Sequence, residues 1–402
     1  MLLGNRLLLR AGLRRRADGW RRGAGLVLRG QGATFVLSAF GLDLWSDVAE
    51  PSSPTIDASR EHFAQRFASF LADDKDCHIC VIREAAEDRV HRCAGPTYTL
   101  RFDAWIPSAG RFVPPDDWHG DDCSNGRNAG DPLFTVVCRI DHAGVADVWM
   151  RINHIGMDGV LAQEILSRLE SAWGVAGEVV YPTPESFITH SSPRRCFGCD
   201  DILELNAFLD FGPLLAWRKS ENARLPEPMT LSAAVIWCLA RHPTFCGLHV
   251  GTTVDVPAAE GLGRGVGMIS IRAANYLQRR DGLAQFVKKF NHELALTRKR
   301  ASGGCRSLDA AALIPPRLAT RVLRHALQTP RVFGSIGLTV LRDAKVFGAP
   351  LADAGHPHGF IAIGSVNLPA ADGRRVACVC IKGRDARICT YPQSIQEAID
   401  QL

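Results

Sequence analysis

Apolar residues recur every three or four positions in several segments of the chain, a spacing typical of helices that bury one face. In residues 159–173, leucine, isoleucine and tryptophan side chains line one face, while charged and polar side chains line the other. Helices are also predicted at 59–71, 231–241, 283–298 and 394–402. We therefore expect helices in both halves of the chain.

Alternating or continuous apolar runs predict strands between these helices. The runs are 77–83, 97–104, 133–140 and 147–154 in the first half, and 249–256, 266–272, 332–341, 360–366 and 375–382 in the second half. Two segments rich in turn-forming residues interrupt this pattern. Residues 105–131 are predicted to form a loop, and residues 181–200 are the strongest linker candidate.

Strands and helices on both sides of the linker predict an α/β fold with two halves of comparable size, each a mixed sheet with flanking helices. The expected organisation is an Arg-rich N-terminal extension at 1–35, a first half at 36–180, a linker or crossover at 181–228 and a second half at 229–402. A length of 402 residues suits two or three domains.

The composition is that of an ordinary globular protein, with 46% apolar and 22% charged residues, and it excludes a largely disordered chain. The net charge is +5, and residues 1–35 hold eight arginines and one acid. The remainder is therefore close to neutral, which argues against a nucleic-acid partner. The sequence has no apolar run of 18 residues, so no transmembrane helix is predicted.

The N-terminal extension is loosely amphipathic and poor in acidic residues. These features suit an organelle presequence or an arm that makes weak contact with a membrane surface. The simpler interpretation, which we favour, is an extension without function.

Thirteen cysteines, an odd number, together with no recognisable secretory leader, predict free thiols in a reducing compartment and a cytoplasmic location. Two Cys-x-x-Cys pairs, Cys77 with Cys80 and Cys196 with Cys199, could together hold a structural zinc ion. Cys77 and Cys80 lie in a predicted strand, however, where positions three apart point to opposite faces. No metal site is therefore predicted, and a zinc-stabilised interaction protein is kept as an alternative.

One histidine stands at a position suited to chemistry. His154 ends the apolar row of the strand predicted at 147–154. An imidazole at the end of a rigid strand, walled by apolar groups, stays neutral and can act as a general base. A satisfied core histidine, followed by Asp158 as a helix N-cap, is the alternative. A second pair, His356 and His358, predicts an exposed polar turn.

His154, Asp158 and Gly159, after a strand and before an amphipathic helix, resemble the H-H-x-x-x-D-G signature of the chloramphenicol-acetyltransferase-like superfamily. That superfamily includes peptide-synthetase condensation domains, wax ester synthases and BAHD acyltransferases. Softer similarities follow in the same order, at 229–240, 250–256, 266–270 and 334–337. The resemblance covers the chain from about residue 58 to the C-terminus.

Two departures from the superfamily pattern stand out. Asn153 replaces the first histidine of the signature, which does not carry the chemistry. Pro257 replaces an arginine that commonly contributes to the ion-pair network around the motif's aspartate. Arg272 is the substitute partner that we consider for Asp158.

The resemblance implies an acyltransferase that moves an acyl group from a CoA or acyl-carrier-protein thioester to a hydroxyl or amine of a small-molecule acceptor. It implies an active-site tunnel between the two halves, and no cofactor besides the thioester cosubstrate. His154 would be the general base, Asp158 a structural group, and Gly159 the residue that lets the helix begin close to the strand. Ser335 is the first candidate for oxyanion donor and Ser270 the second, although both could be ordinary strand serines. A non-catalytic binding or scaffold member of the same fold is the alternative.

Overall fold

The structure is a computed structural model. It describes residues 25–30, 33–38, 40–49, 98–103, 134–140, 145–153, 190–196, 199–257, 264–302, 329–341, 345–346, 356–383 and 385–402. Further described positions are 61–62, 64–66, 68–69, 171, 181 and 183. The fold and the site are given for these residues.

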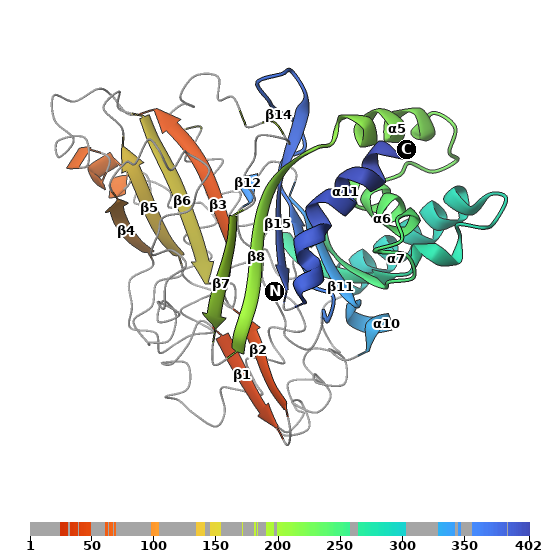
Figure 1. Ribbon diagram of the computed structural model, residues 1–402, viewed down its shortest axis with the longest axis horizontal. Helices are drawn as coiled ribbons and strands as arrows, with labels where there is room; N and C mark the ends of the chain where they lie inside the picture. Colours follow the sequence, from red (N-terminus) through yellow and green to blue (C-terminus); the bar gives the residue numbers. More distant parts are fainter. Residues whose placement is uncertain are drawn as a thin grey trace.

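A large mixed sheet forms the centre of the molecule (Figure 1). Its strands follow the order β10-β9-β11-β13-β15-β8-β7, with β14 paired to β15. The bounds are β7 His190–Cys196, β8 Cys199–Asp210, β9 Val250–Pro257, β10 Arg264–Ile271, β11 Ile336–Val340, β13 Phe360–Ile363, β14 Leu368–Pro369 and β15 Arg375–Gly383. Strand β11 is parallel to both neighbours, and the other pairs are antiparallel. The fold is therefore α/β with an open mixed sheet.

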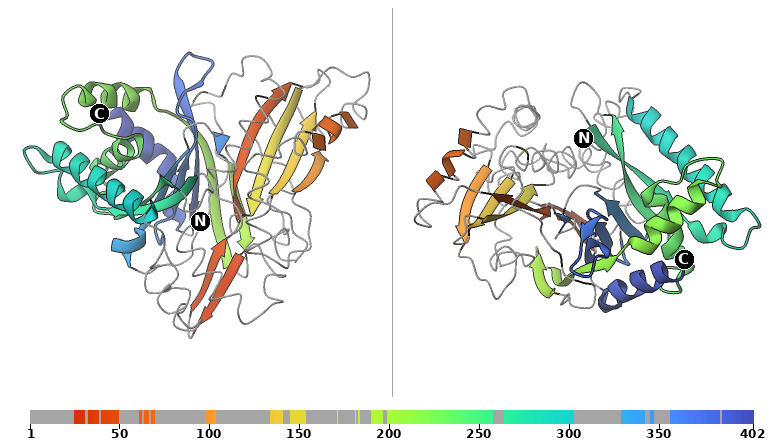
Figure 2. Two further views of the ribbon diagram at one scale, coloured as in Figure 1. Left: turned by 180° about the vertical axis from the view of Figure 1, so that it is seen from behind. Right: turned by 90° about the horizontal axis from the view of Figure 1, so that it is seen from above.

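Helices cover one side of this sheet (Figures 1 and 2). They are α5 Gly212–Asn222, α6 Leu231–Arg241, α7 Gly282–Ser302, α10 Pro330–Phe333 and α11 Tyr391–Asp400. Helix α6 is buried along almost its whole length, because its sequence is apolar on every side except at Ser232 and Arg241. The hydroxyl of Thr230 accepts a hydrogen bond from the N–H of Ala233 at 3.1 Å and so caps the first turn.

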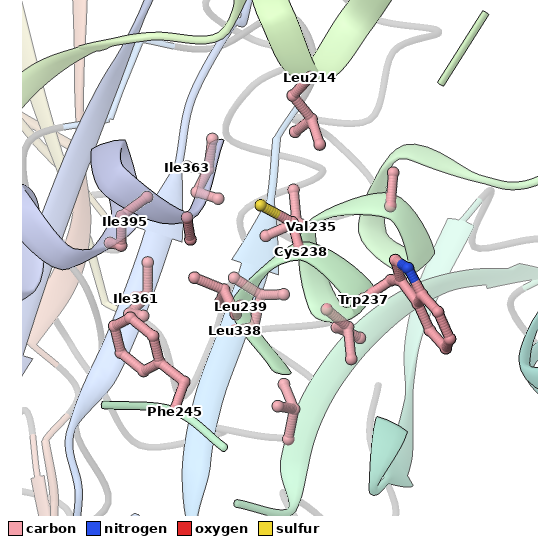
Figure 3. Packing of buried hydrophobic residues seen from close by; sticks show 14 of the residues in the cluster. Leu214, Val235, Trp237, Cys238, Leu239, Phe245, Leu338, Ile361, Ile363 and Ile395 are labelled. Atoms are coloured by element: carbon pink, nitrogen blue, oxygen red, sulfur yellow. The ribbon is translucent and has the colours of Figure 1, made fainter. Parts of the chain in front are cut away.

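The main hydrophobic core lies between these helices and the sheet. Figure 3 shows Ile361 and Ile363 of β13 and Leu338 of β11 pointing toward side chains of α6 and α11. Leu239 of α6 and Ile395 of α11 are among the partners, and all five are at most 3% exposed. Burying a side chain of this size contributes about 1.5–3 kcal/mol relative to leaving it in water. The helix face of the sheet is therefore a major source of stability.

The opposite face of the large sheet is also buried. On β15, Ala377, Val379 and Ile381 belong to the helix-side core, and the alternate positions Cys378 and Cys380 are fully buried on the other side. The described cysteines at these two positions are free thiols. Strand β15 is thus covered on both faces.

A second sheet lies on the side of the large sheet away from the helices (Figures 1 and 2). Its order is β12-β3-β6-β5-β4. The bounds are β3 Phe40–Ala49, β4 Tyr98–Asp103, β5 Phe134–Ile140, β6 Val145–Asn153 and β12 Lys345–Val346. Strand β12, although late in the sequence, pairs with β3 antiparallel. Both parts of the chain therefore contribute to this sheet.

A separate two-stranded hairpin consists of β1 Gly25–Gly30 and β2 Ala33–Ser38. In the sequence, β2 continues past residue 35, where the predicted N-terminal extension ends. The four predicted domain boundaries themselves stay predictions.

Many predicted elements are confirmed. Helix α6 has the predicted bounds, and α7 and α11 overlap the helices predicted at 283–298 and 394–402. Strands β4, β5, β6, β9, β10, β13 and β15 overlap predicted strands. The described positions between residues 61 and 69 are helical, as predicted.

Two predictions of local structure are wrong. Residues 181–200 are not irregular throughout, because β7 fills His190–Cys196 and β8 begins at Cys199. Pro193 weakens the strand pattern, but β7 is an edge strand, where a proline is tolerated. The strand predicted at 332–341 begins later, at Ile336, because residues 330–333 form the short helix α10.

Several predicted features lie outside the described residues. They are the strand at 77–83, the loop at 105–131 and, apart from helical Ser171, the helix at 159–173. His154, Asp158 and Gly159 lie outside them as well.

Candidate active site

The strand that leads to His154 is the middle strand of the second sheet. β6 ends at Asn153, directly before His154, and pairs antiparallel with β3 on one side and β5 on the other. Its Val148 is fully buried, as are Val136 and Cys138 of β5. The strand is paired with β5 as far as Ile152 and with β3 as far as Asn153, whose register partner is Phe40. The placement of His154 itself lies outside the described residues.

Ser335, the first candidate oxyanion donor, is 8% exposed and engaged with the backbone of His249. Its hydroxyl donates to the carbonyl oxygen of His249 and accepts from the N–H of the same residue, each at 3.1 Å. The N–H of Ser335 also donates to that carbonyl, at 2.7 Å. The side chain therefore joins the beginnings of β9 and β11. Its role as an oxyanion donor stays a prediction, and it would require release of the His249 carbonyl.

Ser270, the second candidate, also makes a structural contact. Its hydroxyl donates to the carbonyl oxygen of Pro330 at 2.7 Å and so ties β10 to α10. Arg272 follows β10 and is exposed, with its guanidinium beside Gly247. Asp158 lies outside the described residues, so its position relative to Ser335, Ser270 and Arg272 is not described. The pairing of Arg272 with Asp158 thus stays a prediction.

Gly337 explains why a glycine stands in the segment that resembles the superfamily's S-N-x-G strand. A Cβ at this position would overlap the ring of Phe360 and come within 3.0 Å of the His356 ring. Only a residue without a side chain allows β11 and these rings to approach so closely.

His356 is buried, so the prediction of an exposed turn is wrong at this residue. It is 4% exposed, and its ring packs edge-on against Phe360 at a centroid distance of 5.4 Å. Desolvation lowers the pKa of His356 to about 4, and a hydrogen bond with the backbone of Gly334 opposes that shift. The imidazole is therefore neutral at physiological pH. His358, two residues on, is partly exposed, in agreement with the turn.

Polar residues that the sequence analysis missed lie on the sheet face opposite the helices. Asn206 of β8 and Lys382 of β15 are 2% and 1% exposed. The hydroxyls of Thr253 and Thr339 are hydrogen-bonded at 2.6 Å across β9 and β11. The sequence could have indicated Lys382, because it is a charged residue within the otherwise apolar strand segment 376–382. The face that carries these groups is the one turned toward the second sheet (Figure 2).

Within the described residues, no three or more His, Cys, Asp or Glu side chains are grouped as a metal site requires. Cys196 and Cys199 are register partners across the turn between β7 and β8. Cys77 and Cys80 lie outside the described residues. In the part of the chain that is described, every helix is too short or too polar to cross a lipid bilayer.

Comparison with known proteins finds similar folds among solved structures only. No protein-family model and no curated protein matches the sequence. Among solved structures, the chain is similar to acetyltransferases, condensation domains and a wax ester synthase. The last two are classes to which the sequence motif was compared above.

Three of these structures illustrate the similarity. TRI3 trichothecene 15-O-acetyltransferase from Fusarium sporotrichioides is 11% identical, covers 96% of this chain and 98% of its own, and has a TM-score of 0.48. The starter condensation domain of rhizomide synthetase RzmA, in complex with C8-CoA, is 12% identical with coverages of 90% and 92% and a TM-score of 0.48. The wax ester synthase/diacylglycerol acyltransferase from Marinobacter aquaeolei VT8 is 12% identical with coverages of 90% and 93% and a TM-score of 0.43.

Proposed function

We propose that this protein is an acyltransferase in which His154 is the general base. The observation that carries the proposal is the position of the motif. The histidine directly follows Asn153, the last residue of the middle strand of a sheet, and Asp158 and Gly159 follow at the spacing of the signature. An end-of-strand histidine with this spacing matches the resemblance and suits proton transfer.

The order of elements in the second half supports the same proposal. The segments that resemble the superfamily correspond to α6, the β9–β10 hairpin and the start of β11. In two of them a local feature explains the residue type, namely the Thr230 cap of α6 and the close packing at Gly337. The similarity therefore extends beyond one short motif to a series of consecutive elements.

The proposed reaction is a direct transfer. His154 takes the proton of an acceptor hydroxyl or amine while that atom attacks the carbonyl carbon of an acyl thioester. The tetrahedral intermediate then expels the thiolate, and the imidazolium returns the proton to the sulfur. The products are the acylated acceptor and the free thiol of CoA or of a carrier protein. General-base assistance of this kind typically contributes about 10²–10⁴-fold to the rate.

The other parts of the proposal concern the surroundings of this histidine. Asp158 fixes the loop and thereby the imidazole, and Gly159 lets the next helix begin close to β6. The substrates reach His154 through a tunnel between the two halves, since interfaces between domains are common ligand sites. A cytoplasmic location is included because the odd number of cysteines suits a reducing compartment.

The experiment is a screen of purified protein with acyl-CoA donors and small alcohols or amines, with the acylated product detected by mass. We expect His154→Ala to lower turnover at least 100-fold while the circular dichroism spectrum is unchanged. His292→Ala is the matched control, because His292 is an exposed histidine on α7. Turnover of His154→Ala equal to that of the wild type would refute the proposed role.

A non-catalytic binding protein of the same fold is the second candidate. Two observations favour it: Pro257 in place of the usual arginine, and the engagement of the Ser335 hydroxyl with the backbone of His249. This candidate predicts that donor thioesters bind without product formation. Binding isotherms for acyl-CoA, together with a negative product screen, would favour it over the enzyme.

A further inference from the structure

The end of β10 and the beginning of β9 bring two basic residues to the same edge of the large sheet. These strands are antiparallel, and Val250 is the register partner of Ile271. His249 and Arg272, one step beyond this pair, therefore lie at the same end of the hairpin. Strand β10 is the edge strand of the sheet, so no further strand among the described residues pairs with its outer edge.

A third basic residue comes from α10. Arg331 is exposed on this short helix, and the carbonyl oxygen of the preceding Pro330 accepts a hydrogen bond from Ser270 of β10. Arg331 therefore follows a residue that is hydrogen-bonded near the end of β10, two positions before Arg272. Three elements thus bring Arg272, Arg331 and His249 to the same end of the β9–β10 pair.

The backbone at this point is held firmly. Ser335 bonds both the N–H and the carbonyl oxygen of His249 through its hydroxyl. Gly247 has a φ of +82°, and Arg272 Nη2 lies 3.2 Å from the position that a Cβ would take there. The guanidinium of Arg272 therefore lies across the turn that precedes His249. The basic groups project from a fixed frame, which lowers the entropy lost when they bind a ligand.

Within the part of the chain that the structure describes, the cluster lacks an acidic partner. Among the described residues, no carboxylate forms an ion pair with Arg272 or Arg331. By contrast, the partly exposed Arg374 is paired, with its Nε 2.5 Å from Asp372 Oδ2. The Nδ1 atom of His249 is buried and lacks a hydrogen-bond partner. Desolvation first, and then the charges of Arg272 and Arg331, lower the pKa of His249.

We propose that Arg272, Arg331 and His249 form a binding site for a phosphate-type oxyanion. Two guanidiniums match the charge of a phosphate dianion and can each donate two parallel hydrogen bonds to its oxygens. The bound anion replaces the repulsion between neighbouring cations with attraction. This site is separate from the proposed role of His154 and does not depend on it.

The imidazole gives the site a measurable signature. Negative charge beside His249 opposes the effect of the two arginines, so the pKa of His249 rises when the anion binds. Between the pKa values of the free and the occupied site, binding therefore takes up protons. The uptake is largest when the pH lies between these two values.

The test is calorimetric titration of the full-length protein with inorganic phosphate, repeated in two buffers of different ionisation enthalpy to count the protons taken up. We expect Arg272→Ala and Arg331→Ala each to weaken binding about tenfold, and the double variant about 100-fold. His249→Gln is expected to keep binding within a few fold but to abolish the proton uptake. Arg374→Ala is the matched control, a partly exposed arginine that already has an acidic partner, and it should bind like the wild type.

Adenosine 3′,5′-bisphosphate distinguishes free phosphate from the phosphate of a larger nucleotide ligand. Tighter binding of this compound than of inorganic phosphate, lost in the double variant, would assign the site to a nucleotide ligand. Equal binding would assign it to free phosphate. The proposal is overturned if neither compound binds at low salt, or if the double variant binds both as well as the wild type does. Either result leaves the test of His154 untouched.

Discussion

The two faces of the large sheet are both buried, yet they consist of different kinds of side chain. The face toward the helices is almost entirely apolar, as Leu205, Val379 and Ile361 illustrate, with the hydroxyl-bearing Thr252 as an exception. The opposite face, turned toward the second sheet, carries Asn206 and Lys382 as well as apolar residues. A buried polar atom without a partner, such as Asn206 Oδ1 among the described residues, costs about 1–3 kcal/mol. The composition of the helix face is therefore explained by its contribution to stability, whereas the buried polar residues of the opposite face are not.

Leu205 and Asn206 are adjacent residues that show the difference between the two faces. Both lie on β8, both are 2% exposed, and successive residues of a strand point to opposite faces. Leu205 belongs to the helix-side core, whereas Asn206 Oδ1 has no hydrogen-bond partner in the structure. Equal burial thus has opposite energetic consequences one residue apart.

The largest effect is expected for Leu205→Asn. The substitution removes a leucine from the apolar core, which costs about 2–5 kcal/mol, and adds an amide that finds no partner there. We expect the free energy of unfolding, measured by urea denaturation, to fall by about 4 kcal/mol. A fall of less than 1 kcal/mol would show that the helix face tolerates polar groups and would remove the contrast.

The next effect concerns pH and the ring of His356, which packs against Phe360. Burial lowers the pKa of His356 from 6.5 to about 4, so the unfolded chain binds the proton more tightly than the folded protein does. The stabilising contribution is complete above pH 6.5 and is lost as the pH falls toward 4. The loss amounts to about 3 kcal/mol over this window.

The measurement is urea unfolding at a series of pH values between 4 and 7.5. The variant His356→Gln removes the titrating ring but can still donate a hydrogen bond to the backbone at Gly334. We expect its stability to depend less on pH than that of the wild type, whatever its stability at pH 7.5. Parallel pH profiles for the two proteins would contradict the buried neutral histidine.

The sequence predicted elements whose pattern is local and missed features that depend on distant partners. Helix α6 has the predicted bounds because its apolar pattern lies within one short segment. Strand β7 was missed because pairing with β8 outweighs its weak propensity. The burial of His356 depends on Phe360 and on the strands around it, which no local pattern reveals.

The candidate site also has features that the local sequence predicts and features that depend on distant residues. The spacing of His154 and Asp158 is local and was sufficient to suggest the chemistry. The contacts of Ser335 could not be predicted, because its partner His249 is 86 residues away in the sequence. The cluster of Arg272 and Arg331 also required the fold, since it joins the ends of β10 and α10 to the start of β9.

The smallest effect, of opposite sign, is expected for Asn206→Leu on the face turned toward the second sheet. Leucine has the same number and branching of side-chain heavy atoms as asparagine, and it removes the buried Oδ1 that lacks a partner among the described residues. We expect the free energy of unfolding to rise by up to about 1 kcal/mol, because the desolvation of the amide is no longer required. Urea denaturation in parallel with Leu205→Asn makes the comparison direct. A loss of more than 2 kcal/mol would mean that this face needs its amide for folding, and the two faces would then differ in composition but not in their tolerance of exchange.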